Sequence, residues 1–146
     1  MTDPRDRPLN LAPASVMDYR ELARKKLPRQ LFDYIDGGAY REVTLTENTS
    51  DFDALKMKQR VMRDVSNVDT SVELLDESWS MPLALAPDGL AGMMARRAEV
   101  QAKKAADAVG IPYCLSTVGI CSLEEVAAVS DKPFWFQLYM LRDRGA

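Results

Sequence analysis

The stretch "IPYCLSTVGICSLEEVAAVSDKPFWFQLYM", Ile111 to Met140, decides the fold of this chain. It holds two short apolar runs, "PYCLS" and "FWFQLY", and the segment "SLEEVAAV" between them has helical spacing with Ser122 as its capping residue. A strand, a helix and a second strand in this order require parallel strands, because the connection is too long for a hairpin. The sequence therefore predicts an α/β fold with a parallel sheet.

The segment just before this stretch extends the same pattern. "LALAP", residues 83–87, is small, apolar and continuous, as expected for a strand buried on both faces. Met93 to Val109 is the strongest helical pattern in the chain, and Gly110 is expected to end it. The positions expected to face the sheet are Met94, Val100, Ala105 and Ala108, with the basic residues on the opposite side. The order becomes β-α-β-α-β.

The chain before the main α/β unit is predicted to hold shorter elements. "VELLD" and "SWSMPLALAP" favour extended chain, with a hairpin turn at Asp76 and Glu77. Three helices are expected before them: one capped by Ser15, one opened by Pro28 and ended by Gly37 and Gly38, and one from Thr44 to Leu55. Residues 1–14 are polar and proline-rich, and we expect a flexible lead there.

All three predicted strands end in polar groups: "APDG", "STVG" and "QLY". Ligands of parallel α/β folds bind at the carboxyl ends of the strands, so these residues indicate a binding site. The alternative is that they only cap the helices that follow, as Ser122 does. The pattern alone leaves both interpretations open.

Composition excludes several function classes. The chain has 146 residues, 47% hydrophobic and 28% charged, and its net charge of −3 gives no basic surface for nucleic acid. There is no histidine, so no imidazole base or zinc ligand comes from this chain. Two cysteines, Cys114 and Cys121, are too few for a disulfide scaffold or zinc ribbon, which favours a reducing, cytoplasmic location. The basic pair Lys103-Lys104 is expected to be solvated.

No segment indicates export or membrane insertion. The first residues lack the apolar core of a secretory signal, and no run of about 18 apolar residues occurs.

The predicted parallel sheet is too small to be complete. A closed barrel of alternating parallel strands and helices typically has about 250 residues, and the bulky Phe134, Trp135 and Phe136 leave an edge uncovered. We therefore expect this chain to be the front part of a larger fold, with "RDRGA" opening the next helix.

Four motifs together resemble the FMN-dependent α-hydroxy-acid oxidase and dehydrogenase family, from about Asp18 to Gly145. They are "LPRQLFDYIDGGAYREVTLTEN", "MPLALAPDGLAGM", "GIPYCLSTVGICSLEEVA" and "FWFQLYMLRDRG". The bacterial flavin L-lactate dehydrogenases of the respiratory type are especially similar. The resemblance implies the N-terminal part of a TIM (β/α)8 barrel, preceded by short helices and a β-hairpin. Residues 15–146 would form an incomplete FMN hydroxy acid dehydrogenase domain, with about the first three βα units.

The resemblance also implies a function and a set of site residues. Such enzymes oxidise an L-2-hydroxy acid, here most readily L-lactate, to the 2-oxo acid and reduce FMN. Tyr34 and Tyr139 resemble the substrate-binding tyrosines. The positions that resemble flavin contacts are Pro87, Asp88, Gly89, Ser116 and Gln137. The family's catalytic histidine, substrate arginine and flavin lysine would follow Ala146, so no catalytic residue or metal ligand is assigned here, and the chain alone is expected to be inactive.

Two departures refine this expectation. Asp88 stands where relatives often carry a neutral residue, so its side chain is expected to turn outward. Gly89 stands where many oxidases carry alanine, which favours a dehydrogenase that passes electrons to a quinone or cytochrome. The full-length protein is also expected to form homo-oligomers, with attachment to the inner membrane face as an option.

Three alternatives stay open. One is an oxygen-reducing oxidase similar to glycolate oxidase, the second is a mandelate dehydrogenase, and the third is a non-catalytic half-barrel used for binding.

Overall fold

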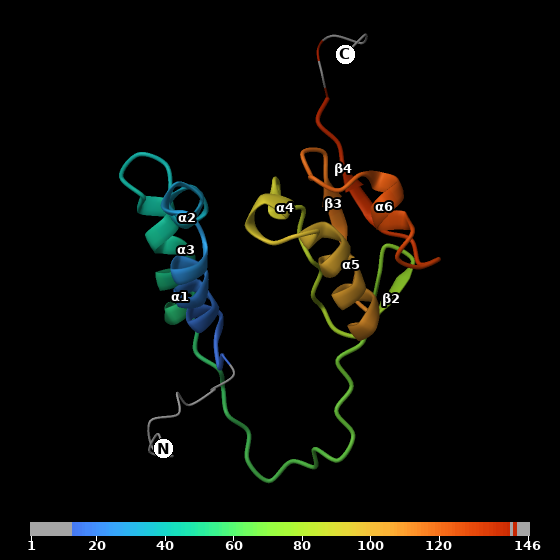
Figure 1. Ribbon diagram of the computed structural model, residues 1–146. Helices are drawn as coiled ribbons and strands as arrows, with labels where there is room; N and C mark the ends of the chain where they lie inside the picture. Colours follow the sequence, from blue (N-terminus) through green and yellow to red (C-terminus); the bar gives the residue numbers. More distant parts are fainter. Residues whose placement is uncertain (1–12, 141, 143–146) are drawn as a thin grey trace, which may run out of the picture. The chain divides into compact units, whose positions relative to one another are not determined.

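A computed structural model gives the fold of residues 13–140 and 142 (Figure 1). The predicted lead lies almost wholly outside these described residues, as does most of "RDRGA". The chain divides into two compact units, Met1–Met57 and Lys58–Ala146. None of the helices in the described part of the chain is long and apolar enough to cross a membrane.

The first unit contains three helices, α1 (Val16–Lys26), α2 (Arg29–Asp36) and α3 (Val43–Ala54). Ser15 caps α1 through a reciprocal capping box with Asp18, as the sequence predicts. The second and third helices also agree with prediction to within a residue or two.

Contacts between α1 and α2 hold the first two helices together. The guanidinium of Arg20 donates to both carboxylate oxygens of Asp36 and lies 5.7 Å from the centre of the Phe32 ring. Phe32 is buried beneath it. A fork-shaped guanidinium can bind a carboxylate and cover an aromatic face at once, so one residue fixes the helix pair.

The second unit begins with an antiparallel hairpin, β1 (Val72–Leu74) and β2 (Glu77–Trp79). Leu75 and Asp76 form the turn, with φ of 54° and 59°. Two positive φ angles in a two-residue loop match the right-handed twist of the flanking strands. The predicted turn at Asp76 and Glu77 was therefore wrong by one residue, because Glu77 already pairs with β1.

The predicted β-α-β unit is confirmed. β3 (Cys114–Ser116) and β4 (Trp135–Gln137) pair in parallel, and α6 (Leu123–Ala127) connects them. Ser122 caps α6 through a second capping box, with Glu125. The register places Ser116 opposite Gln137, so the last residues of the two strands are neighbours.

The prediction for "LALAP" was only partly right. Leu85 lies beside β3, donating its N–H to Pro112 and accepting that of Cys114, but these bonds form a single bridge rather than a strand. Leu83 is 52% exposed. Leu85 is partly buried against the core, and neither leucine has the burial on both faces that the sequence pattern predicts.

The continuous helix predicted from Met93 to Val109 was wrong. It divides into α4 (Ala91–Met94) and α5 (Ala98–Val109), because Arg97 adopts a left-handed conformation with φ 54°. Gly110 ends α5 with φ 73°, as predicted.

The buried face of α5 agrees with the prediction at Val100 and differs elsewhere. Ala105 and Ala108 are exposed, whereas the helix buries Glu99, Val100, Lys103 and Ala106. The core of the second unit joins Val100 and Ala106 of α5 to Leu115 of β3 and Val126 of α6, with Ile111, Tyr113 and Cys121 beside them.

Lys103 is the clearest exception to the sequence pattern, since the prediction of a solvated basic pair was wrong for it. Its side chain is 1% exposed. The ammonium donates to both Asp107 carboxylate oxygens at 2.6 Å and to the Ser130 hydroxyl at 3.1 Å. Ser130 in turn donates to Asp107 at 2.7 Å. A buried ammonium is tolerated here because all its N–H donors meet acceptors.

Candidate functional site

The carboxyl ends of β3 and β4 bring two predicted site residues together. Ser116 is buried, and its hydroxyl lies 3.4 Å from Oε1 of Gln137. The backbone N–H of Thr117 donates to the same oxygen at 3.2 Å. Because this N–H can only donate, the amide oxygen of Gln137 must face β3. Its Nε2 has no hydrogen-bond partner among the described residues and remains available as a donor.

Thr117 links the two strand ends, a role that the sequence did not assign to it beyond its place among the polar residues of "STVG". Its hydroxyl donates to the backbone carbonyl of Gln137 and accepts the backbone N–H of Tyr139 at 3.1 Å. These bonds hold the chain that leaves β4 against the end of β3. The side chain of Tyr139 is 56% exposed at this edge. The available signal was its place next to Ser116, because a hydroxyl that follows a strand often binds neighbouring backbone.

The loop containing Gly89 packs against the same edge. Leu90 donates its N–H to the carbonyl of Val118 at 3.0 Å. A Cβ on Gly89 would lie only 2.9 Å from a methyl group of Val118 and 3.9 Å from the Ser116 hydroxyl. Pro87 and Asp88 are exposed beside it. The backbone of Gly89 thus approaches Val118 more closely than a residue with a side chain would permit.

Two buried ionisable groups lie behind this edge. Burial by itself raises the pKa of Glu99, but backbone N–H donors, Ile120 foremost, outweigh burial and hold that pKa below its usual value. The pKa of Tyr113 is raised to about 12 by its burial and by the nearby Glu99 charge. At neutral pH the edge is therefore backed by an ionised carboxylate and a neutral phenol.

Tyr34 is the predicted site residue that belongs to the first unit. It lies on α2, and its side chain is 68% exposed. Its phenol is thus free to contact a ligand.

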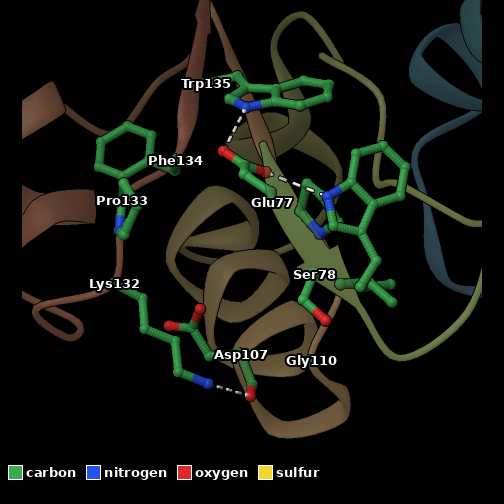
Figure 2. A pocket seen from close by; sticks show the side chains of 11 residues that line it. Glu77, Ser78, Asp107, Gly110, Lys132, Pro133, Phe134 and Trp135 are labelled. Carbon is green, nitrogen blue, oxygen red and sulfur yellow. Dashed lines mark hydrogen bonds between the residues drawn. The ribbon is translucent and has the colours of Figure 1, made fainter. Parts of the chain in front are cut away.

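A cavity of about 300 Å³ lies at the opposite, amino ends of the strands (Figure 2). Trp79 and Trp135 each donate an indole N–H to the Glu77 carboxylate, at 3.1 and 3.2 Å. Their rings are 5.6 Å apart. Lys132 closes another side of the cavity through a bond to the backbone carbonyl of Asp107. Since parallel sheets bind ligands at the carboxyl ends, we assign this cavity to the packing of the hairpin on β4.

The edge formed by Gly89, Ser116, Thr117 and Gln137 can bind a flat, acceptor-rich ligand. It offers the amide Nε2 of Gln137, the weakly held hydroxyl of Ser116 and a stretch of closely approaching backbone. An O–H···O contact of 3.4 Å is longer than the common 2.7–2.8 Å, so the Ser116 proton can turn to a better acceptor.

Comparisons with known proteins show which family the chain is similar to. The model of the family described as FMN-dependent dehydrogenase matches residues 23–146. An L-lactate dehydrogenase of Caulobacter sp. is 58% identical over 90% of this chain and 35% of its own length. One from Haemophilus influenzae is 54% identical with the same coverage. The chain thus spans about 35% of the length of the curated relatives that it matches.

Solved structures show the same relationship. A soluble mutant of the membrane-associated (S)-mandelate dehydrogenase from Pseudomonas putida matches with a TM-score of 0.82 and 38% identity, over 87% of this chain and 36% of that one. A mandelate oxidase with bound (S)-4-hydroxymandelic acid matches with a TM-score of 0.83 and 34% identity, over 91% and 37%. The prediction that this chain forms part of a TIM barrel is confirmed by this likeness.

Proposed function

We propose, from the fact that this chain belongs to the FMN-dependent dehydrogenase family, that it is the flavin-binding front part of an L-2-hydroxy-acid dehydrogenase. L-Lactate is the proposed substrate, and pyruvate the product. The observation that carries the proposal is the pair Ser116 and Gln137, aligned at the carboxyl ends of β3 and β4 beside the Gly89 loop. The relatives named L-lactate dehydrogenase, 54% to 58% identical, support the choice of substrate.

The residues at this edge fit a flavin. The isoalloxazine ring is flat and carries several carbonyl and ring-nitrogen acceptors, and Gln137 has an amide N–H₂ group with no partner among the described residues. The missing side chain at Gly89 lets the backbone approach a planar ring. We propose that Gln137 and Ser116 donate to the ring and that Pro87, Asp88 and Gly89 contact it through their backbone.

When bound, FMN supplies the two-electron acceptor for oxidation of the substrate. The proposed part of this chain is to bind and orient. Fixed donors such as Gln137 Nε2 favour negative charge nearby, because they need no rearrangement during the reaction. Thr117 keeps Gln137 in place by binding its backbone carbonyl.

Tyr34 and Tyr139 are the proposed substrate ligands. A phenol can pack its ring against apolar surface and still donate its O–H to an anion. Tyr34 is proposed to donate to the substrate carboxylate and Tyr139 to contact the hydroxyl group. We further propose that the base that removes the substrate proton lies outside these 146 residues, which contain no histidine.

The electron acceptor, assembly and location are also proposals. A membrane quinone or a cytochrome is the proposed acceptor, since Gly89 stands where many oxidases carry alanine. The full-length protein is proposed to form a homo-oligomer in the cytoplasm, with peripheral attachment to the inner face of the membrane.

The test uses the full-length protein that contains this chain. It should purify with bound FMN and reduce an artificial dye such as dichlorophenolindophenol when L-lactate is added, with little oxygen uptake. D-Lactate is the control substrate and should give no reduction. A protein that binds no FMN, or one that ignores every 2-hydroxy acid, would refute the proposal.

A second substrate, mandelate, is favoured by the solved structures at 34% to 38% identity. The same assay separates the two possibilities through the ratio of kcat/KM for L-lactate to that for (S)-mandelate. A ratio well below one would favour mandelate, and rapid oxygen uptake would favour an oxidase.

A further inference from the structure

One buried carboxylate oxygen joins two loops of the second unit. Oε1 of Glu99, at the start of α5, accepts the backbone N–H of Gly92 at 3.0 Å and that of Ile120 at 2.8 Å. Gly92 belongs to α4, which follows the Gly89 loop, and Ile120 belongs to the loop that follows β3. Glu99 is 1% exposed. On folding, the two N–H groups therefore replace their hydrogen bonds to water with hydrogen bonds to this carboxylate oxygen.

The two loops are the ones that carry the proposed flavin contacts. The first begins at Pro87, Asp88 and Gly89, and the second begins directly after Ser116. They also bind each other, because Leu90 donates to the carbonyl of Val118, and Val118 donates its N–H to the Ser116 hydroxyl at 3.3 Å. The positions of Gly89 and Ser116 therefore depend on how closely the loops approach each other.

Gly92 shows that this approach is tight. A Cβ on Gly92 would lie 2.6 Å from Cβ of Ile120 and 3.1 Å from Oε2 of Glu99. No real side chain fits at that distance without a shift of the loop. Gly92 and Glu99 thus set the distance between the two loops together. Gly92 has no side chain to separate them, and Glu99 accepts a backbone N–H from each.

The charge of Glu99 strengthens this arrangement. Hydrogen bonds from N–H groups to a carboxylate are stronger than those to a neutral oxygen, and the positive end of the α5 dipole favours a negative charge in its first turn. The second oxygen, Oε2, is buried without a hydrogen-bond partner among the described residues. The protein retains a costly buried charge at this point, which indicates that the geometry it fixes matters.

We propose that Glu99 is a positioning residue for the flavin site, which holds the Gly89 loop and the loop after Ser116 at the spacing that FMN requires. It does so without touching the cofactor. The inference rests on the proposed function, because it concerns the same site.

The experiment measures FMN binding by the full-length apoprotein, from the quenching of FMN fluorescence, with the urea midpoint recorded for each variant. Glu99→Leu keeps the approximate volume and removes both acceptor oxygens. Its Kd for FMN should rise by about tenfold or more, a factor that corresponds to about 1.4 kcal/mol. Glu99→Gln keeps one acceptor oxygen and should raise the Kd less. Gly92→Ala leaves Glu99 intact but forces the loops apart, so it should also raise the Kd.

Asp107→Asn is the matched control. Asp107 lies on the same helix, takes part in a partly buried polar cluster, and sits at the end of α5 away from the two loops. It should lower the urea midpoint while the Kd for FMN stays within about twofold. If Glu99→Leu does not fold, the Kd values for FMN of Glu99→Gln and Gly92→Ala are compared with that of Asp107→Asn and test the proposal in its place.

The outcomes test the proposed function and the positioning role of Glu99 separately. A wild-type protein that binds no FMN would refute the proposed function. A wild-type protein that binds FMN, with Kd values in the Glu99 and Gly92 variants no higher than in Asp107→Asn, would overturn the positioning role alone. A Kd that rises in those variants and not in the control supports it.

Discussion

Replacing Lys103 with methionine should destabilise the protein far more than replacing its neighbour Lys104. The Lys103 ammonium is buried and donates to both Asp107 oxygens and to Ser130. Methionine keeps most of the aliphatic volume beside Phe134, so the change removes the charge while leaving little cavity. What remains is a carboxylate at Asp107 that has lost its cation.

The magnitude follows from the burial of the two partners. Breaking a fully buried ion pair by removing one partner costs about 3–5 kcal/mol. Asp107 is 17% exposed and keeps its hydrogen bond from Ser130, so part of its charge stays solvated. We therefore expect a loss near the lower end, about 3 kcal/mol. Lys104→Met, on the exposed side of the same helix, should change the free energy of unfolding by less than about 0.5 kcal/mol.

Urea unfolding of the full-length protein, followed by tryptophan fluorescence, gives these free energies. The double variant Lys103→Met with Asp107→Leu removes both charges and should recover most of the loss, because an apolar pair needs no solvation. If Lys103→Met matched Lys104→Met, or if the double variant were no more stable than Lys103→Met, the buried-pair reasoning would be wrong.

The pH dependence gives an independent check. Burial raises the pKa of Asp107, but Lys103 and Ser130 outweigh it and hold the pKa below the usual 3.8. A lowered pKa in the folded state contributes stability that is present above the unfolded value and is lost as the pH falls through the folded value. The gap between wild type and Lys103→Met should therefore be full near pH 7 and should narrow below about pH 4. A gap that stayed constant into this acid range would count against the pair.

Three further predictions concern single residues of the full-length protein. Gln137→Leu should weaken FMN binding by about 0.5–1.5 kcal/mol, because it removes one hydrogen bond, while the urea midpoint changes little. If the flavin affinity and the reduction potential did not change, Gln137 would have only a structural role. Tyr34→Phe should lower kcat/KM for L-lactate by an amount equivalent to about 1.5–3 kcal/mol, because it removes a hydrogen bond to a charged group, and the flavin content should not change. Unaltered kinetics would show that Tyr34 does not belong to the site. Gly110→Ala should cost about 1–2 kcal/mol in urea unfolding because the residue has φ 73°, and a neutral result would contradict the left-handed cap.

The sequence by itself was sufficient for the elements whose signals are local. Ser15 and Ser122 each precede an acidic residue by three positions, and both form capping boxes. The alternation of "PYCLS", "SLEEVAAV" and "FWFQLY" required parallel strands, so it also placed Ser116 and Gln137 at the same edge of the sheet. These predictions succeeded because each depends on neighbours along the chain or on the period of one element.

Only the tertiary structure decided which side of α5 is buried. Apolar spacing selected Ala105 and Ala108, yet the protein buries Glu99 and Lys103 instead. Part of the energy that permits this comes from partners distant in sequence: Ile120 for Glu99, and Ser130, which binds both Lys103 and its helix neighbour Asp107. A charged side chain is costly to bury alone and tolerable once its hydrogen bonds are made, and periodicity contains no information about those distant partners.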